Sequence, residues 1–515
     1  MAKTARSQSA WKTGSFSSRT TGPRPCMPPR SWMPFIVLPL RSGPARSPRY
    51  KHRPGAAVKM ARPGSKEGCQ PLRNIYNLEP EWKAGRLPGA RTGRKEEMNF
   101  MENGRKPLMP EAFGPLQGVR ILSTGTIIAQ PYAAHMAAEM GAEVVQIERP
   151  NSVGDEYRYL GIRLKGPEGH EAGTSWVQER RNAFYITLDL SSPQGRDVFL
   201  RLIPHFDIWM EASRPGTYDR WGLSDEVVLQ ANPRLVIAHV SGYGQTGHPD
   251  YLGRPSYDMI GQAFGGLMYL TGFPDPEPPV RANPWTGDYI TALFCLWASL
   301  AGYIYAQRTG RGQVIDVAQF ECIHHTLAGT MVEWFQAGVV RERSGNKATA
   351  FQPYDAFMAK DGWLVVGAFN ESMYERLCRV IGLDPQDEKW RRARTNVFSP
   401  EGEEFDAILR GWIIERTVKE VVEALSAAEV ACCPIMSSRD MAEDPHYQAR
   451  QVHVEWEDVQ VGKVKGFGVT PRFSLTPGRI WRGSVPVGYD NELVYGQLLG
   501  LSQEEVASLR SQGVI

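Results

Sequence analysis

The chain has 515 residues, which is enough for two or more domains with a large hydrophobic core. Its formal charge of +3 is the sum of two unlike parts. Residues 1–97 contain 20 Lys and Arg against 5 Asp and Glu, and the remaining residues contain 39 Lys and Arg against 51 Asp and Glu. The part with globular patterning is therefore acidic, which argues against nucleic-acid binding by that part.

We expect residues 1–112 to form a basic, disordered extension, because they are rich in Arg, Pro, Ser and Gly and lack a sustained apolar period. A tail that binds nucleic acid or membrane, an Arg- and Ser-rich transit peptide and an over-extended reading frame are the three interpretations. Frequent prolines oppose the amphipathic helix of a transit peptide. Since folded patterning begins abruptly at Leu116, we favour an over-extended frame with the working start at Met98, Met101 or Met109.

Seven scattered cysteines, without CxxC or a Cys/His ligand spacing, predict a reducing, cytoplasmic location and no metal site. His324 and His325 are adjacent and diverge by about 100° on a helix, so they are not expected to chelate together. Residues 289–306 form the one segment long enough to resemble a membrane span. Strand and helix patterns flank it, so we expect a buried core or interface helix and no membrane partner.

Short apolar runs alternate with helical patterns from residue 116 onward. Strands are expected at residues 119–123, 143–147, 183–190, 207–211, 235–240 and 313–317. Helices are expected at residues 131–140, 194–203, 224–230, 257–269, 289–307 and 319–336. This alternation predicts an α/β fold with a doubly wound, mostly parallel sheet in a large Rossmann-like domain.

A smaller α+β domain is predicted to follow the first part of the large domain, residues 113–340. It spans residues 341–435 and contains a hairpin of residues 354–357 and 363–367 and helices at 373–381 and 418–427. Residues 436–515 are expected to return to the large domain and to end in a helix at 504–510.

No dinucleotide or phosphate-loop motif follows the first expected strand. Residues 123–127 read Ser-Thr-Gly-Thr-Ile and fit neither the GxGxxG nor the GxxxxGK[ST] pattern. Nicotinamide, flavin and ATP chemistry by those routes is therefore disfavoured.

Asp288 stands at the start of the long apolar segment. The preceding residues 283–287 read Asn-Pro-Trp-Thr-Gly and form a turn, so Asp288 is predicted at or next to a helix N-terminus, where negative charge is stabilised. It is either a helix-capping aspartate or a nucleophilic carboxylate aimed into a cleft.

Four segments in fixed order decide between these interpretations. They are residues 116–149, residues 207–222, residues 235–247 together with 256–266, and the turn before Asp288. In this order and spacing they resemble the family III CoA-transferases of the CaiB/BaiF type, from about residue 113 to the C-terminus. Residues 211–213, 235–242 and 477–483 suggest a likeness to the L-carnitine CoA-transferases within that family.

The resemblance implies that Asp288 is the catalytic carboxylate. The aspartate would attack an acyl-CoA thioester to give a mixed anhydride and then an aspartyl-CoA thioester, and a carboxylic acid would repeat the steps in reverse. The implied substrates are an acyl-CoA and a free acid, with no tightly bound cofactor. The implied assembly is an interlocked homodimer.

The resemblance also implies contacts to CoA. The phosphates or adenosine are assigned to Arg149, Arg214 and Arg220. The backbone of Ile127, Ile128 and Ala129 is expected to approach the thioester. Ile128 stands where some members of the family have glutamine, so no polar side-chain contact is expected there.

Tyr257 is predicted to belong to the catalytic site, although a packed aromatic residue is the alternative. The racemases of the same superfamily have His-Asp where this chain has Tyr257-Asp258, and use the pair to remove a proton. A phenol with an unperturbed pKa of about 10 is a poor base near neutral pH, which favours transfer over racemisation. The glycine-rich loop of formyl-CoA transferases is missing from the sequence, which disfavours oxalate–formate exchange.

Two other functions remain open at this point. One is a racemase acting on 2-methylacyl-CoA, and the other is a non-enzymatic binding protein that uses the basic arm. If the acid is carnitine or crotonobetaine, Trp285, Tyr289 and Trp334 are candidates to face its trimethylammonium group.

Overall fold

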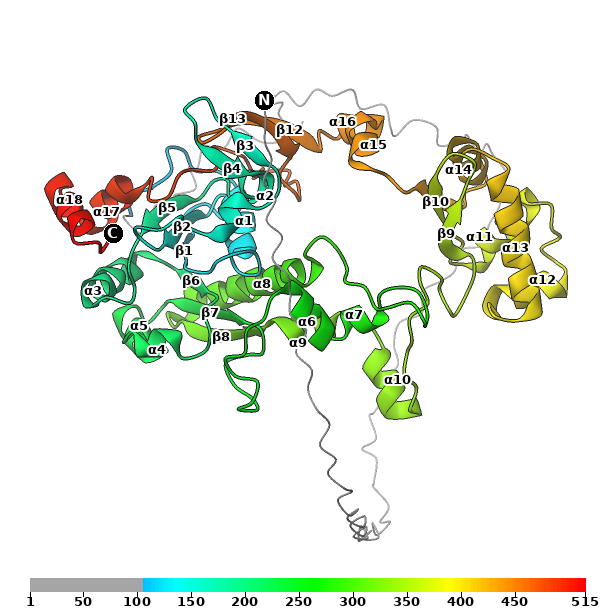
Figure 1. Cartoon of the computed structure of the whole chain (residues 1–515), viewed down its shortest axis with the longest axis horizontal. Helices are drawn as coiled ribbons and strands as arrows, with labels where there is room; N and C mark the ends of the chain where they lie inside the picture. The colour runs from blue at the N-terminus through cyan, green and yellow to red at the C-terminus, as the bar shows by residue number, and fades with distance from the viewer. Residues whose placement is uncertain (1–104) are drawn as a thin grey trace, which may run out of the picture. The chain divides into compact units, whose positions relative to one another are not determined.

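The computed structural model of the chain describes residues 105–515 (Figure 1). The predictions for most of the basic extension, including starts at Met98 and Met101, lie outside these residues. Leu108 and Met109 are each 5% exposed and belong to the hydrophobic core, so the fold includes residues ahead of Leu116.

A six-stranded parallel sheet forms the centre of the larger part. Its strands are β1 (Arg120–Ser123), β2 (Glu143–Glu148), β5 (Phe184–Thr187), β6 (Ile208–Glu211), β7 (Val236–Ser241) and β8 (Gln313–Ala318). Their order is β5-β2-β1-β6-β7-β8, and every neighbouring pair is parallel. The predicted parallel, doubly wound sheet is confirmed.

Each face of this sheet has its own hydrophobic core, because successive side chains of a strand point to opposite faces. Leu122 packs into one core with helices α3 (Pro193–Leu202) and α5 (Asp225–Ala231). Its neighbour Ile121 packs into the other core with α1 (Pro131–Glu139) and α8 (Thr286–Thr309). Figure 1 shows these helices in layers on either side of the sheet.

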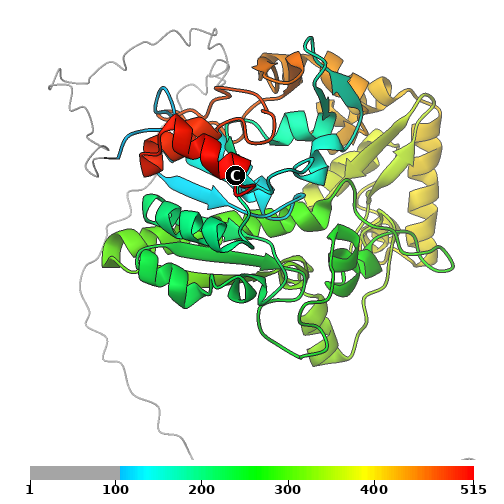
Figure 2. The same ribbon diagram turned by 60° about the vertical axis from the view of Figure 1, so that its left-hand side comes forward.

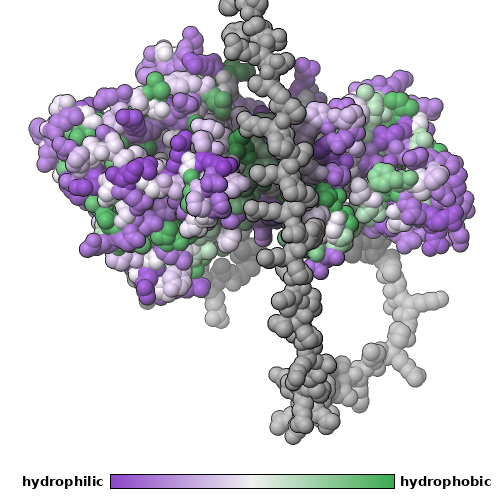
Figure 3. Space-filling view, turned by 60° about the horizontal axis from the view of Figure 1, so that its bottom comes forward, coloured by the Kyte–Doolittle hydropathy of each residue, from purple (hydrophilic) through white to green (hydrophobic). Residues whose placement is uncertain are grey.

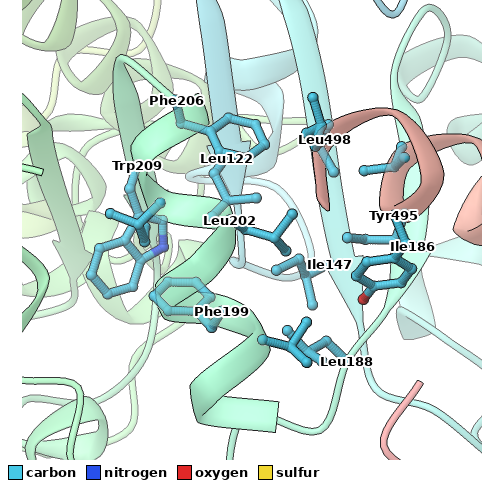
Figure 4. Close-up of a cluster of buried hydrophobic side chains, with 14 of the residues drawn as sticks. Leu122, Ile147, Ile186, Leu188, Phe199, Leu202, Phe206, Trp209, Tyr495 and Leu498 are labelled. Atoms are coloured by element: carbon cyan, nitrogen blue, oxygen red, sulfur yellow. The ribbon is translucent and has the colours of Figure 1, made fainter. Parts of the chain in front are cut away.

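The C-terminal segment, which contains helices α17 (Asn491–Leu499) and α18 (Gln503–Ser511), packs against the larger part (Figure 2). Tyr495 of α17 is fully buried, and its hydroxyl donates to the Thr187 carbonyl of β5 at 2.7 Å. Figure 4 shows Tyr495 and Leu498 beside Ile147 and Ile186 of the sheet.

A second, antiparallel sheet has strand order β11-β10-β9 and its own core. Its strands and helices are β9 (Tyr354–Met358), β10 (Trp363–Gly367), α11 (Glu371–Val380), α12 (Glu388–Thr395), α13 (Pro400–Ile414), α14 (Val418–Ala427) and β11 (Ala431–Pro434). The hairpin of β9 and β10 was predicted, whereas α12, α13 and β11 were not. The domain boundaries at residues 341 and 435 stay predictions.

The remaining elements are short. They are the pairs β3 (Arg163–Lys165) with β4 (Glu171–Gly173) and β12 (His453–Asp458) with β13 (Gly462–Phe467), and helices α2 (Thr174–Glu179), α4 (Thr217–Arg220), α15 (Ser438–Glu443) and α16 (Pro445–Ala449).

Two helices predicted as continuous are each broken. The segment 257–269 forms α6 (Asp258–Phe264) and α7 (Leu267–Leu270), because Gly266 between them has a φ of +90°. The segment 319–336 forms α9 (Gln319–His325) and α10 (Thr330–Ala337), and Ala328 in the break has a φ of +51°. A left-handed residue stops the helical backbone, and an apolar pattern alone does not reveal it.

Helix α8 was predicted to be a buried core or interface helix, and in this chain one of its faces is buried while another is exposed. Leu293 and Trp297 are 54% and 59% exposed, and Ile304 is also exposed. On the side shown in Figure 3, hydrophobic residues reach the surface among hydrophilic ones. Within residues 105–515, α8 is the one helix long and apolar enough to cross a membrane by length and composition, and it packs on α1, α9, β7 and β8.

Candidate active site

A cavity of about 210 Å³ opens at the carboxyl ends of β1, β6 and β7. The chain continues from β1 to β2 and β5 on one side and returns to β6, β7 and β8 on the other, so the strand order reverses between β1 and β6. Ligands of open α/β sheets bind at such a reversal. The cavity is lined by residues 126–129, 212–215, 240–244 and 253–257, and by Asp288 and Gln319.

Asp288 lies in the first turn of α8 and is 6% exposed. It is not the cap of the helix. That function belongs to Asp258, whose Oδ1 accepts the backbone N–H of Gly287 at 2.8 Å and that of Asp288 at 3.2 Å. The capping interpretation of Asp288 is therefore wrong, and its own carboxylate is left for the cavity.

The Asp288 carboxylate is oriented by a hydrogen-bond relay from α9. Gln319 donates its Nε2–H to Asp288 Oδ1 at 2.5 Å, while its Oε1 accepts from the Ser256 hydroxyl at 3.1 Å. Because an ionised carboxylate only accepts hydrogen bonds, the amide nitrogen faces Asp288, and the amide oxygen is left to accept from the Ser256 hydroxyl. The relay thus holds one oxygen of Asp288 and leaves the second oxygen without this partner.

Burial, and then the neighbouring charge of Asp258, raises the pKa of Asp288 to about 7, although the hydrogen bond from Gln319 lowers it. Near neutral pH this carboxyl is therefore divided between its ionised and protonated forms. A carboxyl held at such a pKa inside a cleft is a candidate for chemistry.

The loop after β1 lines the same cavity as Asp288. The N–H of Ile127 donates to Asp155 Oδ2 at 2.9 Å and so is not free for a ligand. Among residues 105–515, the N–H groups of Ile128 and Ala129 make no hydrogen bond to a backbone or side-chain acceptor. These two amides are the candidate donors to a ligand oxygen in the cavity.

Arginine side chains surround the two cavities at this edge of the sheet. Arg214 and Arg254 line the cavity of Asp288, and Arg149 lines a second cavity of about 330 Å³. The two cavities share Thr126 and Ser213. All three arginines are exposed, and no ion pair within the described residues neutralises them, so they are available to an anionic ligand.

Comparison with known proteins identifies the family. Residues 116–491 match the profile of CoA-transferase family III. The bile acid CoA-transferase BaiK of Clostridium scindens is 36% identical over 413 residues, which cover 78% of this chain and 90% of BaiK. The chain belongs to CoA-transferase family III.

Other relatives agree with this assignment. Succinyl-CoA–D-citramalate CoA-transferase of Chloroflexus aurantiacus is 34% identical over 78% of this chain and 98% of its own length. L-carnitine CoA-transferase of Proteus mirabilis is 32% identical over 79% and 97%. The crystal structure of a CAIB/BAIF family protein from Brucella suis superposes with a TM-score of 0.66 at 26% identity, covering 75% of this chain and all of that one. The chain is thus a CoA-transferase, which removes the non-enzymatic alternative.

The structure of this CoA-transferase brings most of the predicted site residues together. Six of them line the cavity of Asp288 itself, namely Asp288, Tyr257, Ile127, Ile128, Ala129 and Arg214. Arg149 lines the adjoining cavity. Arg220 lines neither of these two cavities, since it lies on α4, where its guanidinium donates to Thr217 Oγ1 at 3.0 Å.

The aromatic residues suggested for a trimethylammonium group do not line the cavity. Trp285 stacks on Arg281 at 4.7 Å, and the Tyr289 hydroxyl donates to Glu179 at 2.6 Å. Trp334 lies on α10 and is 50% exposed. Their contact with a trimethylammonium group therefore stays a prediction that this cavity does not support.

His324 and His325 are exposed at the end of α9, and His325 packs edge-on against Phe294. Within residues 105–515, no group of three His, Cys, Asp or Glu side chains has an arrangement that could hold a metal ion.

Three residues of the site were missed by sequence reasoning: Asp258, Gln319 and Arg254. Gln319 directly follows the last strand of the sheet, and a polar residue at that position is a signal that was available. Asp258 acts on a helix 29 residues further along the chain, which no local pattern reveals. Arg254 lies in an irregular loop, and no pattern in a single sequence identifies it as a site residue.

Proposed function

We propose that this CoA-transferase moves CoA from an acyl-CoA to a free carboxylic acid, with Asp288 as the nucleophile. The observation that carries the proposal is a buried carboxylate with a pKa of about 7 in a cavity at the reversal of the strand order. Covalent catalysis suits an exchange between two acids, because it divides one difficult step into similar acyl transfers.

The proposed steps begin when the free oxygen of Asp288 attacks the thioester carbonyl. The C–S bond breaks, which leaves an acyl–aspartyl anhydride and CoA thiolate. The thiolate then attacks the Asp288 carbonyl of the anhydride, so that the donor acid departs and an aspartyl-CoA thioester remains. The acceptor carboxylate attacks this thioester, and the released thiolate attacks the acceptor acyl carbon, which restores the Asp288 carboxylate.

The oxyanion that forms at each attack needs hydrogen-bond donors already in place. The N–H groups of Ile128 and Ala129 are the proposed donors, because they line the cavity of Asp288 and have no acceptor within residues 105–515. The low exposure of Asp288 also limits the access of water, which would hydrolyse an anhydride.

Racemisation of a 2-methylacyl-CoA is the second candidate, since the same thioester could bind in this cavity. It needs a base at the α-carbon. Tyr257, which takes the place of the histidine used by racemases, is 69% exposed at the start of α6. Incorporation of deuterium at the α-carbon without transfer of CoA to an added acid would favour the racemase.

Replacement of the nucleophile gives the first prediction. Asp288→Ala is expected to reduce CoA exchange by on the order of 10³-fold or more, because no other group can form the anhydride. The variant should keep its melting temperature, since Asp258 still caps α8. With acyl-CoA alone, mass spectrometry of the wild-type protein is expected to find an adduct on the peptide that contains Asp288.

The matched control is Asp219→Ala, which removes an exposed carboxylate on α4. It should leave exchange unchanged. Substantial turnover by Asp288→Ala would show that the nucleophile is another residue.

The second prediction concerns pH. The ionised form of Asp288 is the nucleophile, so the exchange rate should fall as pH drops below about 7. Asp258→Asn keeps an oxygen to accept the N–H groups of α8 but removes the charge that raises the pKa of Asp288. The acid limb of the pH–rate profile should therefore move to lower pH. Gln319→Leu removes a donor that lowers the pKa, so the limb should move to higher pH.

The measurement is kcat/KM from about pH 5 to about pH 9 for the wild type and both variants. The two shifts must have opposite signs. Shifts of equal sign would mean that a side chain other than Asp288 titrates in the acid limb of the pH–rate profile.

The acid substrate is proposed to carry a second negatively charged or hydrogen-bonding group. Among the described residues that line the cavity, Asp288 is the single acid, while Arg214 and Arg254 are cations. Two guanidinium groups repel a trimethylammonium group and attract a carboxylate. A dicarboxylic or hydroxy acid is therefore favoured over carnitine, and a succinyl-CoA-dependent enzyme is among the relatives.

Arg254→Ala gives the third prediction. Loss of one charge-assisted hydrogen bond should raise KM for a dicarboxylic acid by on the order of 10-fold or more and leave KM for acyl-CoA unchanged. Malate, citramalate, cholate and carnitine form the test panel. The control is Arg234→Ala, an exposed arginine at the opposite, amino-terminal edge of β7. A higher KM for acyl-CoA instead would assign Arg254 to CoA.

A second copy of the chain is the proposed partner of the exposed face of α8. Leu293, Trp297 and Ile304 lie on this face, because their spacing of four and eleven residues returns to one side of a helix. Exposed apolar residues in such a row are typical of a subunit interface. The homodimer expected from the family would cover them.

The fourth prediction tests this partner. The wild type should sediment as a dimer, and Leu293→Asp with Trp297→Asp should sediment as a monomer, because a buried interface does not accept unpaired carboxylates. Arg308→Ala, an exposed polar change on the same helix, is the control. A monomeric wild type would contradict the proposal.

A further inference from the structure

Ile127 has a backbone conformation that its side chain disfavours. Its φ is +67°, in the left-handed region, and it lines the active-site cavity. Six non-glycine residues among the described ones have positive φ: Ile127, Asn151, Asn182, Ala328, Glu429 and Gln451. Ile127 is the single β-branched residue of this set, and β-branched residues adopt this region only when their surroundings enforce it.

Two buried side chains hold the peptide groups of Ile127 from both sides. Asp155 Oδ2 accepts the Ile127 N–H at 2.9 Å, and the Arg180 guanidinium donates to the Ile127 carbonyl. Asp155 is 6% exposed and Arg180 is 3% exposed. We call these two side chains the Ile127 clamp.

The clamp is itself fixed by buried hydrogen bonds. Asp155 Oδ1 accepts the Tyr157 N–H at 3.0 Å, and the Asp155 N–H donates to Glu148 at 2.9 Å. Arg180 stacks over the Tyr157 ring at 4.6 Å and donates to the Glu179 carbonyl at 3.0 Å. Both clamp residues therefore have little freedom to move away from Ile127.

The same network reaches the helix of Asp288. The Glu179 carboxylate accepts the hydroxyl of Tyr157 at 2.6 Å and that of Tyr289 at 2.6 Å. Tyr289 follows Asp288 directly in α8. The buried Glu179 carboxylate thus links Tyr157, which packs on the clamp, to the first turn of α8, which contains Asp288.

The conformation of Ile127 decides where the next two amides point, since its φ and ψ set the orientation of the following peptides. Ile128 and Ala129 line the cavity, and their N–H groups have no acceptor within residues 105–515. We infer that Asp155 and Arg180 are positioning residues that hold Ile127 in the left-handed conformation and so aim the Ile128 and Ala129 amides at the thioester oxyanion. This inference rests on the proposed function.

A double-mutant cycle tests the inference, because glycine adopts a φ of +67° without help. Asp155→Ala is expected to slow formation of the aspartyl-CoA thioester by on the order of 10–100-fold in single-turnover experiments, with little change in KM. The rate of Ile127→Gly alone is the reference for the double variant. Adding Asp155→Ala to Ile127→Gly should then cost several-fold less than it costs the wild type.

Two further variants separate positioning from a general structural effect. Asp155→Asn keeps one oxygen that can accept the Ile127 N–H but turns an NH2 group toward the Tyr157 N–H, so it should restore part of the rate that Asp155→Ala loses. Arg180→Met is expected to give the same result as Asp155→Ala in a second double-mutant cycle with Ile127→Gly. This second cycle replaces the first if Asp155→Ala does not fold. Arg181→Met is the control, because this arginine is equally buried and donates its hydrogen bonds to Glu139 and the Phe467 carbonyl, not to Ile127.

The outcomes distinguish the inference from the proposed function. If the wild type forms no adduct on Asp288, the proposed function fails. If it does form the adduct, and both clamp variants slow the reaction by the same factor in the wild-type and the Ile127→Gly backgrounds, the inference alone is overturned. A coupling between Arg181→Met and Ile127→Gly as large as that of the clamp variants would likewise overturn it.

Discussion

The N-terminus of α8 has to hold two carboxylates, Asp258 and Asp288, in a region with little water. Burial raises the cost of ionising Asp288, and the like charge of Asp258 raises it further. The structure reduces this cost unequally. Asp258 receives two backbone N–H groups of α8 and one Nε2–H of Gln262, whereas Asp288 receives one hydrogen bond from Gln319. Asp288 is therefore the carboxyl whose proton is held near neutral pH.

The parallel sheet makes this arrangement possible by collecting distant segments. The carboxyl ends of parallel strands share one edge, so the loops after β1, β6 and β7 meet although more than 100 residues separate the first from the last. Gln319 follows β8, the edge strand next to β7, and reaches the same cavity. The residues that line the cavity thus come from the connections after four different strands.

The elements with a clear apolar period were predictable, and the contacts between elements were not. All six strands of the parallel sheet and Asp288 at the head of α8 follow from apolar runs bounded by turn residues. The breaks at Gly266 and Ala328 depend on backbone angles that apolar spacing does not encode.

Contacts between residues far apart in the chain could not be predicted from the sequence either. The capping of α8 by Asp258 and the direction of Arg220 depend on tertiary packing. The sequence also left open whether α8 is a core helix or an interface helix, because an apolar helix looks the same whether it meets a core or another subunit.

The buried polar network around Ile127 explains why this edge of the molecule is not simply apolar. Asp155, Glu179 and Arg180 are all buried, and apolar residues of similar size at such positions often give a more stable protein. Networks of this kind persist where geometry matters more than stability. Four hydrogen bonds of the network end on a backbone group of Ile127 or on the hydroxyl of Tyr157 or Tyr289. These bonds fix the loop at Ile127 relative to the first turn of α8, and the proposed mechanism requires that the amides of this loop and Asp288 keep one geometry.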